Sequence, residues 1–449
     1  MRITFIAPAR HIQIRGDLPE HRGVGGGITA LIRVARALAD LGHTVTVIAH
    51  VPVPHTHAGV RYISLDAPES LETDVLIVTI TAPAWEPELL TKWRIPARLC
   101  IAWIHGAELH AFPENPDVVY VPSHFLRSDL PRHWPITRTR LWVTPNGVPD
   151  DWPDPDPLQH TGDTAPLRLV YVGTPAKGCD AAVRVTQRLR AMGLNVELHV
   201  YGGGALYGQS EPSRRSQPPG TVFHGTVPQP VLYRRLSAHT FALFLQHIQD
   251  AFGLALLETM RAGVIPIASS VGAYPELVRS GWNGFLIEGD PLDDTTIERA
   301  AALIRFCTDH PEYMAYMREQ ARRSVIWTWS RTARAWTVHW QILLGRTVPP
   351  EIDPQWGVCP ECGGPWWALA DGYHCGRCGR YQSELQFTDP RVVQSELMHL
   401  RRQAATWALI ERSRGFRLLR KYWQWRQWLR DRIADLRCGK PSSPSDDVP

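Results

Sequence analysis

Two acidic side chains, Asp250 and Glu258, are the residues whose types and spacing most directly indicate chemistry. Asp250 follows an apolar segment, residues 240–246, that is predicted to be a buried strand, and Glu258 lies eight residues later in a predicted helix. A second apolar segment, residues 264–269, comes directly after that helix. A strand, a helix and a strand in this order predict a parallel sheet, whose carboxyl edge is where ligands bind. We therefore expect both carboxylates at a ligand site.

The predicted helix begins near Gly253, between Phe252 and Leu254, and its first turn is a further chemical feature. The backbone N–H groups of a first helical turn have no partner inside the helix, and the helix dipole makes this end positive. Such an end favours a phosphate group, whereas the two nearby carboxylates favour sugar hydroxyls. The combination predicts a site for a nucleotide-sugar. The alternative is that the same residues are a solvated helix carboxylate and an ordinary turn glycine.

This stretch resembles the acidic-x7-acidic segment of retaining glycosyltransferases of the GT-B fold, in the large family-4 group. Segments 263–268, 272–277 and 283–285 agree with that family in order and spacing. The family has Glu at the first acidic position, where this chain has the shorter Asp250. The resemblance covers about residues 1–345 and implies an α/β architecture in which two Rossmann-like domains face a cleft. It also implies glycosyl transfer from a nucleoside-diphosphate sugar, without a catalytic metal and with retention of configuration.

The amino-terminal part opens with a Rossmann-like unit. Residues 3–9 predict a strand, and the glycine-rich segment 23–27 leads into a predicted helix at 28–42. These glycines do not form Gly-x-Gly-x-x-Gly, and no acidic residue ends the next predicted strand, so a dehydrogenase is disfavoured. The resemblance instead assigns Gly25 and Gly26 to the family's Gly-Gly loop, which contacts the donor phosphates and the acceptor.

The resemblance assigns roles to further residues at the ends of predicted strands. It implies that Lys177 and the helix start at Gly253 stabilise the leaving diphosphate, and that Glu258 holds the nucleotide ribose. Asp250 and His105 would orient the donor sugar, and the departing phosphate would supply acid–base assistance. The expected donor site is completed by loop residues, namely Asn146, Gly173, Thr174 and Gly202.

Simpler explanations exist for three of these residues. His105 could be a polar cap at the end of a strand, and Lys177 could be a solvated side chain at the start of a helix. Asn146 could belong to an ordinary Asn-Gly turn. The family also carries an arginine where this chain has Thr174, so that one charge of the diphosphate clamp is absent from its usual position. Arg184 or Arg214 is the candidate replacement.

Length and composition set the expected domain organisation. A chain of 449 residues is too long for one ordinary domain, and residues 151–166 are rich in Pro and Asp, which predicts a linker. We expect an N-terminal Rossmann-like acceptor domain at 1–150 and a C-terminal Rossmann-like donor domain, ending in a crossover helix, at 167–345. A net charge of +4 gives no global argument for nucleic-acid binding. No apolar run is long enough for a signal peptide or a membrane span, so a cytoplasmic location is expected.

Two Cys-x-x-Cys pairs lie beyond the region of resemblance and are separated by twelve residues: Cys359 and Cys362, then Cys375 and Cys378. Four thiolates on two glycine-supported turns form a closed tetrahedral set, which binds zinc structurally and leaves no open position for chemistry. Residues 355–382 therefore predict a zinc ribbon, which at this size would need its metal to fold. The other four cysteines are scattered, as in a reducing compartment.

Residues 390–437 predict a basic, aromatic helical extension. Between 401 and 437 there are eleven Lys or Arg against three Asp or Glu, and the apolar residues fall at three- and four-residue steps. Three roles remain open, namely packing on the protein or a second copy, lying on an anionic membrane surface, or contacting nucleic acid, which is disfavoured. The membrane alternative would place the protein peripherally on the inner face of the membrane.

The acceptor is left open by the sequence and is expected to be a glycan, a lipid-linked compound or a small molecule. Two alternatives to a sugar transferase of this kind also remain. The departures at Thr174 and Asp250 motivate a catalytically weak GT-B-like scaffold protein that acts through its zinc ribbon and basic tail. The other alternative is a transferase that acts on modified nucleic acid and docks through the tail.

Overall fold

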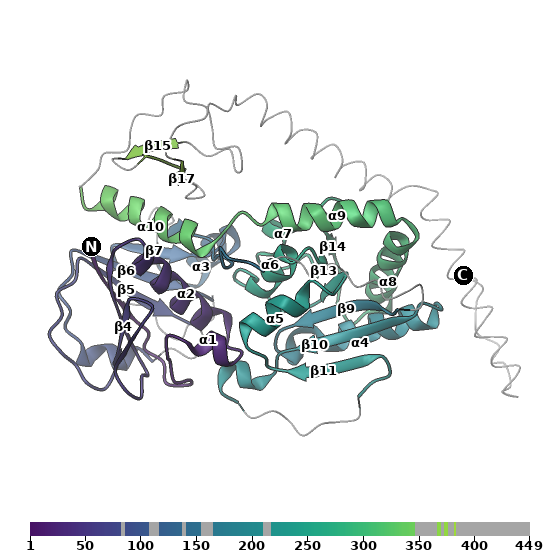
Figure 1. Cartoon of the computed structure of the whole chain (residues 1–449), viewed down its shortest axis with the longest axis horizontal. Helices are drawn as coiled ribbons and strands as arrows, with labels where there is room; N and C mark the ends of the chain where they lie inside the picture. Colours follow the sequence, from purple (N-terminus) through teal and green to yellow (C-terminus); the bar gives the residue numbers. More distant parts are fainter. Residues whose placement is uncertain are drawn as a thin grey trace, which may run out of the picture.

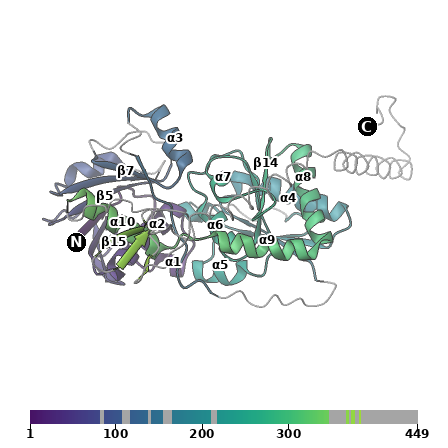
Figure 2. The ribbon, with the colours of Figure 1, turned by 90° about the horizontal axis from the view of Figure 1, so that it is seen from above.

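The computed structural model describes the chain in six segments, followed by three short strands: residues 1–81, 86–106, 116–136, 141–153, 165–209 and 217–345, then 366–369, 372–375 and 381–382. Two lobes lie side by side, each built on its own sheet (Figure 1). The first lobe is purple to blue and the second is teal to green. Seen from above, the two lobes remain distinct bodies, with α10 lying on the first (Figure 2).

The first lobe contains an eight-stranded sheet in the order β3-β4-β2-β1-β5-β6-β7-β8. All neighbouring strands are parallel except β3 and β4. Consecutive residues of the central strands are buried, so both faces of the sheet are covered, which explains the unbroken apolar runs. The strands are β1 Arg2–Ile6, β2 Thr44–Ala49, β3 His55–His57, β4 Val60–Ser64, β5 Val75–Ile80, β6 Leu99–Ile104, β7 Val118–Val121 and β8 Leu141–Val143. The helices are α1 Leu18–His21, α2 Gly26–Asp40, the 3-10 helix η1 Pro87–Lys92 and α3 His124–His133.

The second lobe contains a six-stranded parallel sheet in the order β11-β10-β9-β12-β13-β14. The strands are β9 Leu167–Val172, β10 Val196–Tyr201, β11 Thr221–Gly225, β12 Phe241–Phe244, β13 Ile265–Ser269 and β14 Phe285–Ile287. The helices are α4 Pro175–Ala191, the 3-10 helix η3 Gly204–Tyr207, α5 Gln229–Leu236, α6 Leu254–Arg261, α7 Tyr274–Leu277, α8 Asp294–Asp309 and α9 Pro311–Ser324. Strands β9, β10 and β11 follow one another outward on one side of the sheet. The chain then returns to β12, which lies beside β9, and continues outward through β13 and β14 on the other side. Such a reversal leaves a ligand-binding crevice between the carboxyl ends of β9 and β12.

The helix α10, Trp329–Leu343, returns to the first lobe after the second is complete (Figure 1). Its buried Trp336 and Trp340 belong to the core of the first lobe, and the Trp336 ring centre lies 4.8 Å from that of Trp103. Tyr120 Oη and His339 Nδ1 lie 2.7 Å apart in the same region. The last described helix of the 217–345 segment therefore packs as part of the first lobe, as the family resemblance implied.

Most predicted strands and helices of residues 1–345 are present, but some bounds differ and several short elements were not predicted. The sequence predicts a helix at 180–192, but α4 begins earlier, at Pro175, because a proline suits the first helical position. This start places Lys177 in the first turn of the helix. A further helix is predicted at 312–329, and the corresponding α9 ends at Ser324. The helices α3 and α5 were not assigned from the sequence.

The carboxy-terminal extension is described in part. Strands β15 Trp366–Leu369, β16 Gly372–Cys375 and β17 Tyr381–Gln382 form a three-stranded antiparallel sheet. Cys375 ends β16, whereas Cys359, Cys362, Cys378 and residues 390–437 lie outside the described residues. In the part of the chain that is described, no group of three or more His, Cys, Asp or Glu is arranged to hold a metal ion. None of the described helices is long and apolar enough to cross a membrane.

Candidate functional site

A cleft of about 1320 Å³ lies between the two lobes and is lined by residues of both. Its second-lobe wall is formed by the loops after β9 and β12, at the point where the strand order of that sheet reverses. Its first-lobe wall is formed by the glycine-rich start of α2, the end of β6 and one side of α3. The volume exceeds that of a typical pocket for one small ligand, so the cleft has room for a nucleotide-sugar together with part of an acceptor.

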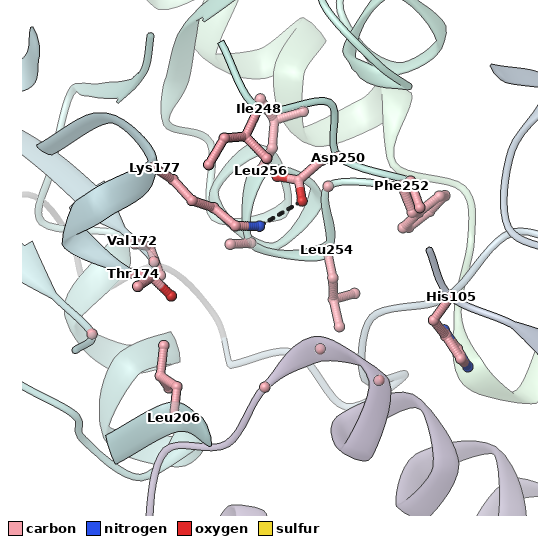
Figure 3. A pocket seen from close by; sticks show the side chains of 18 of the residues that line it. His105, Val172, Thr174, Lys177, Leu206, Ile248, Asp250, Phe252, Leu254 and Leu256 are labelled. Atoms are coloured by element: carbon pink, nitrogen blue, oxygen red, sulfur yellow. Dashed lines mark hydrogen bonds and ion pairs between the residues drawn. The ribbon is translucent and has the colours of Figure 1, made fainter. Parts of the chain in front are cut away.

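Lys177 and Asp250 meet at the carboxyl edge of the second sheet. Lys177 Nζ lies 2.7 Å from Asp250 Oδ1, and both side chains are about three-quarters buried (Figure 3). Burial is the largest single influence and works against the charge of Lys177, but Asp250, through its charge and its hydrogen bond, and Tyr207 together raise the pKa of the lysine. The other oxygen of Asp250 accepts hydrogen bonds from Tyr274 Oη at 2.8 Å and Gln246 Nε2 at 3.1 Å. Asp250 is therefore fixed by three donors.

Glycines shape the backbone of the second-lobe wall. Gly202 has a φ of +123°, and a Cβ there would lie 2.1 Å from the carbonyl oxygen of Gly173. Gly253 precedes α6 with a left-handed φ of +88°, which turns the chain sharply into the helix. Both positions require glycine, and the backbone they shape lines the cleft together with the predicted Thr174, Phe252 and Leu254.

Glu258 lies in α6 at the base of the same wall. Its side chain is only 6% exposed, and its Oε1 accepts a hydrogen bond of 2.8 Å from Tyr233 Oη. Burial raises the pKa of Glu258 to about 7, although the Tyr233 hydrogen bond and the charge of Arg33 both act to lower it. The group is therefore poised between its neutral and ionised forms near neutral pH.

His105 and Asn146 bring unpartnered polar atoms to the first-lobe side of the cleft. Among the described residues, His105 Nε2 and Asn146 Oδ1 are buried and have no hydrogen-bond partner. Burial lowers the pKa of His105 to about 3, so its imidazole is neutral at neutral pH. Figure 3 shows His105 at the same pocket, apart from the Lys177–Asp250 pair and with its ring directed away from it. Both atoms line the cleft, so a ligand or a water bound there has hydrogen-bonding groups to pair with.

The glycine-rich start of α2 contacts the second lobe directly. The Gly25 N–H donates to the carbonyl of Leu206 at 3.1 Å, and a Cβ on Gly25 would lie 2.9 Å from the Tyr207 ring. Gly26 begins α2 and also lines the cleft. In this arrangement the N–H of Gly25 is engaged by protein, so the N–H groups that follow it in α2 are the ones directed to a ligand.

Arg184 was one of two candidates to replace the missing clamp arginine, and this prediction is wrong. Its guanidinium pairs with Asp294 Oδ1 at 2.5 Å and donates to the Leu292 carbonyl, next to α8 rather than in the cleft. Arg214 lies outside the described residues. Lys177 is the only Lys or Arg among the described residues that line the cleft.

Four residues of the second lobe have structural roles that the sequence did not reveal: Tyr233, Gln229, Tyr274 and Glu276. Gln229 joins the lobes, because its Oε1 accepts from Arg33 at 2.8 Å and its Nε2 donates to Thr29 at 3.1 Å. Glu276 accepts from the backbone N–H groups of His124 and Phe125, at 2.9 and 2.6 Å, and so caps α3 of the first lobe. Their partners are distant in the sequence, so no local pattern could indicate them.

The Glu276→Ala change is expected to speed hydrogen exchange at the amides of His124 and Phe125 by about 3- to 10-fold. These amides would lose an acceptor in a partly solvated contact, which contributes on the order of 1 kcal/mol. Amide exchange followed by mass spectrometry would measure the change, with Glu312→Ala on α9 as the exposed control. Equal exchange in all three proteins would show that the two lobes do not hold this contact in solution.

Comparisons with known proteins agree with this architecture. Residues 166–309 match the family model described as Glycosyl transferases group 1. Three solved structures are similar to the chain over 76–77% of its length and nearly all of theirs. They are a glycosyltransferase from Rickettsia africae (TM-score 0.56, 16% identity), sucrose-phosphate synthase from Thermosynechococcus elongatus (0.57, 17%) and Anabaena HepE in complex with UDP-glucose (0.54, 16%).

A curated relative extends the comparison. The phosphatidylinositol N-acetylglucosaminyltransferase gpi3 subunit of Schizosaccharomyces pombe is 23% identical over 212 residues, which are 46% of this chain and 44% of that protein. The chain therefore has the α/β GT-B architecture and contains a group 1 glycosyltransferase domain. Together the domain and the fold support a glycosyl-transfer enzyme as the class of this protein.

Proposed function

We propose that this chain transfers a sugar from a nucleoside-diphosphate sugar, held mainly by the second lobe, to an acceptor held by the first, with retention of configuration. The observation that carries the proposal is the Lys177–Asp250 pair at the reversal point of the second sheet, in the same cleft as His105, whose buried Nε2 has no partner among the described residues. A cation, a carboxylate and a neutral imidazole in one cleft match a diphosphate joined to a sugar.

Each residue has one task in this proposal. Lys177 stabilises the negative charge that develops on the leaving diphosphate, and Glu258 accepts hydrogen bonds from the nucleotide ribose. Asp250 and His105 orient the donor sugar. Because the pKa of His105 is near 3, its imidazole acts as a hydrogen-bonding group and does not take up the acceptor proton at neutral pH. The resemblance assigns acid–base assistance to the departing phosphate oxygen, and the proposal includes no catalytic metal.

The donor is tested by offering the full chain a panel of UDP-, GDP- and ADP-sugars. UDP-glucose and UDP-N-acetylglucosamine come first, because one structural neighbour is in complex with UDP-glucose and the curated relative is named for N-acetylglucosamine transfer. Glycans, lipid-linked sugars and small glycosides are offered as acceptors, and nucleotide release and product are measured. Tight nucleotide-sugar binding with no turnover on any acceptor would favour the scaffold alternative instead.

The zinc ribbon remains part of the proposal. Metal analysis of the full chain is expected to give one zinc per chain through Cys359, Cys362, Cys375 and Cys378. A Cys362→Ser variant should lose the metal, whereas a variant at Cys307, which is buried in the second lobe, should retain it.

Membrane attachment through residues 390–437 is tested with vesicles. The full chain and a variant ending at Gly345 are sedimented with anionic and with neutral vesicles. Salt-sensitive pelleting of the full chain alone would support a peripheral location on the inner face of a membrane, because each Arg or Lys near an anionic surface adds about 1 kcal/mol. Negligible pelleting of both proteins would exclude this attachment.

A further inference from the structure

One side of α3 forms the part of the first-lobe wall that has no role in the proposed donor site. Phe125, Asp129 and His133 lie four residues apart, so they share one face of the helix, and Trp134 follows at its end. All four residues line the cleft. We call them the α3 wall. Two are half-buried aromatic rings, one is an acidic group whose side chain is 13% exposed, and one is an exposed imidazole.

The α3 wall lies next to Asp250, the carboxylate that orients the donor sugar in the proposed function. Ala251, the residue after Asp250, packs against the same first-lobe cluster of apolar residues as Phe125 and Trp134. Helix α7 also links Asp250 to the α3 wall. Its Tyr274 donates a hydrogen bond to Asp250, and its Glu276, two residues later, caps the start of α3. A group bound on the α3 wall is therefore held in register with the carboxylate that orients the donor sugar.

The chemistry of the α3 wall favours a neutral ring rich in hydroxyl groups. Aromatic side chains present apolar faces to the C–H surface of such a ring, and a carboxylate accepts hydrogen bonds from its hydroxyls. Asp129 is paired at 3.6 Å with both Arg132 and His133, which is beyond hydrogen-bond length, so its oxygens can still accept. Arg132 is 73% exposed and does not line the cleft. An anionic group on this wall would therefore be repelled by the carboxylate of Asp129.

We infer that the α3 wall is the acceptor subsite and that it takes a neutral polyhydroxylated ring, a sugar or a cyclitol, with Asp129 as the residue that selects hydroxyls over anions. The inference rests on the proposed function, because it names the second substrate of the same cleft. Asp129 is here a specificity-determining residue that contacts the acceptor, and Glu276 is a positioning residue that acts through α3.

The test is saturation-transfer NMR on the full chain, with and without UDP. The neutral probes are methyl α-D-glucoside and myo-inositol, and the anionic probe is glycerol phosphate. A neutral probe is expected to bind, and its dissociation constant should rise about tenfold in Asp129→Ala, because a charge-assisted hydrogen bond is lost. The Asp129→Asn change keeps an acceptor oxygen and should have a smaller effect. Asp40→Ala, an exposed carboxylate at the end of α2, should have none.

UDP binding, measured on the same samples, separates the two proposals. GDP and ADP are tried beside UDP, and if none of the three nucleotides binds to any of the proteins, the proposed function fails, whatever the neutral probes do. If UDP binds but neither neutral probe does, or Asp129→Ala leaves the neutral probe unaffected, only the acceptor inference is overturned. Stronger binding of glycerol phosphate than of both neutral rings would overturn it as well. Unchanged UDP binding by Asp129→Ala would show that the variant keeps its fold.

Discussion

Replacing Lys177 with methionine is expected to lower the rate of sugar transfer by about 10²- to 10³-fold, the usual effect of removing one oriented electrostatic group from an active site. Lys177 is the only Lys or Arg among the described cleft-lining residues, and the family's clamp arginine is replaced by Thr174. No second described cation can therefore compensate for its loss. Methionine keeps most of the length of the lysine side chain and removes its charge together with its N–H donors.

Asp250 would keep its position in this variant. Its second oxygen is still held by Tyr274 and Gln246, so a loss of activity would report the missing charge rather than a displaced carboxylate. The transfer rate at saturating donor is the measurement. The control is Arg305→Met, which breaks an exposed ion pair with Asp309 on α8 and should leave the rate unchanged. A rate within threefold of the unmodified protein would remove Lys177 from the diphosphate site.

The sheets and the donor loops could be predicted because their signals are local. Unbroken apolar runs marked the central strands, and the polar residues directly after them, Lys177 and Asp250, had to meet at one sheet edge once the strands were parallel. The first-turn position of Lys177 was missed because the helix was assigned to begin at Asp180. Pro175 was the available signal, since it suits the first position of a helix.

The residues that hold the site in place could not be predicted in the same way. Tyr233, Tyr274 and Glu276 act through hydrogen bonds to partners 24 to 152 residues away. Their positions follow from how the two sheets and the two lobes pack, which no short pattern encodes. The same reason explains the error at Arg184, because whether an arginine faces the cleft or α8 depends on the packing of α4.

The Glu258→Gln change is expected to stabilise the nucleotide-free protein by roughly 1–3 kcal/mol at pH 8, and by much less at pH 4 to 5. Burial raises the pKa of Glu258 in the folded protein to about 7, above the value of about 4.3 in an unfolded chain. Below pH 4 both states are protonated, and the group makes no difference. As the pH rises from 4 to 7 the unfolded chain ionises first, so stability falls, and above pH 7 the full penalty remains. Glutamine carries no charge and still accepts the Tyr233 hydrogen bond.

Urea unfolding of the second lobe at pH 5 and pH 8 measures this difference, and Glu319→Gln is the matched control. Glu319 is 43% exposed in an ion pair with Arg322, so its replacement should change stability little at either pH. The Glu258→Gln change should lower the affinity for UDP although it raises stability, because its amide offers one acceptor oxygen to the ribose where the carboxylate offers two. A Glu258→Gln protein that is less stable than the unmodified chain at pH 8 would show that the buried carboxylate is stabilised by its surroundings. In that case Glu258 would be a structural residue of the second lobe, and its place in the ribose site would have to be given up.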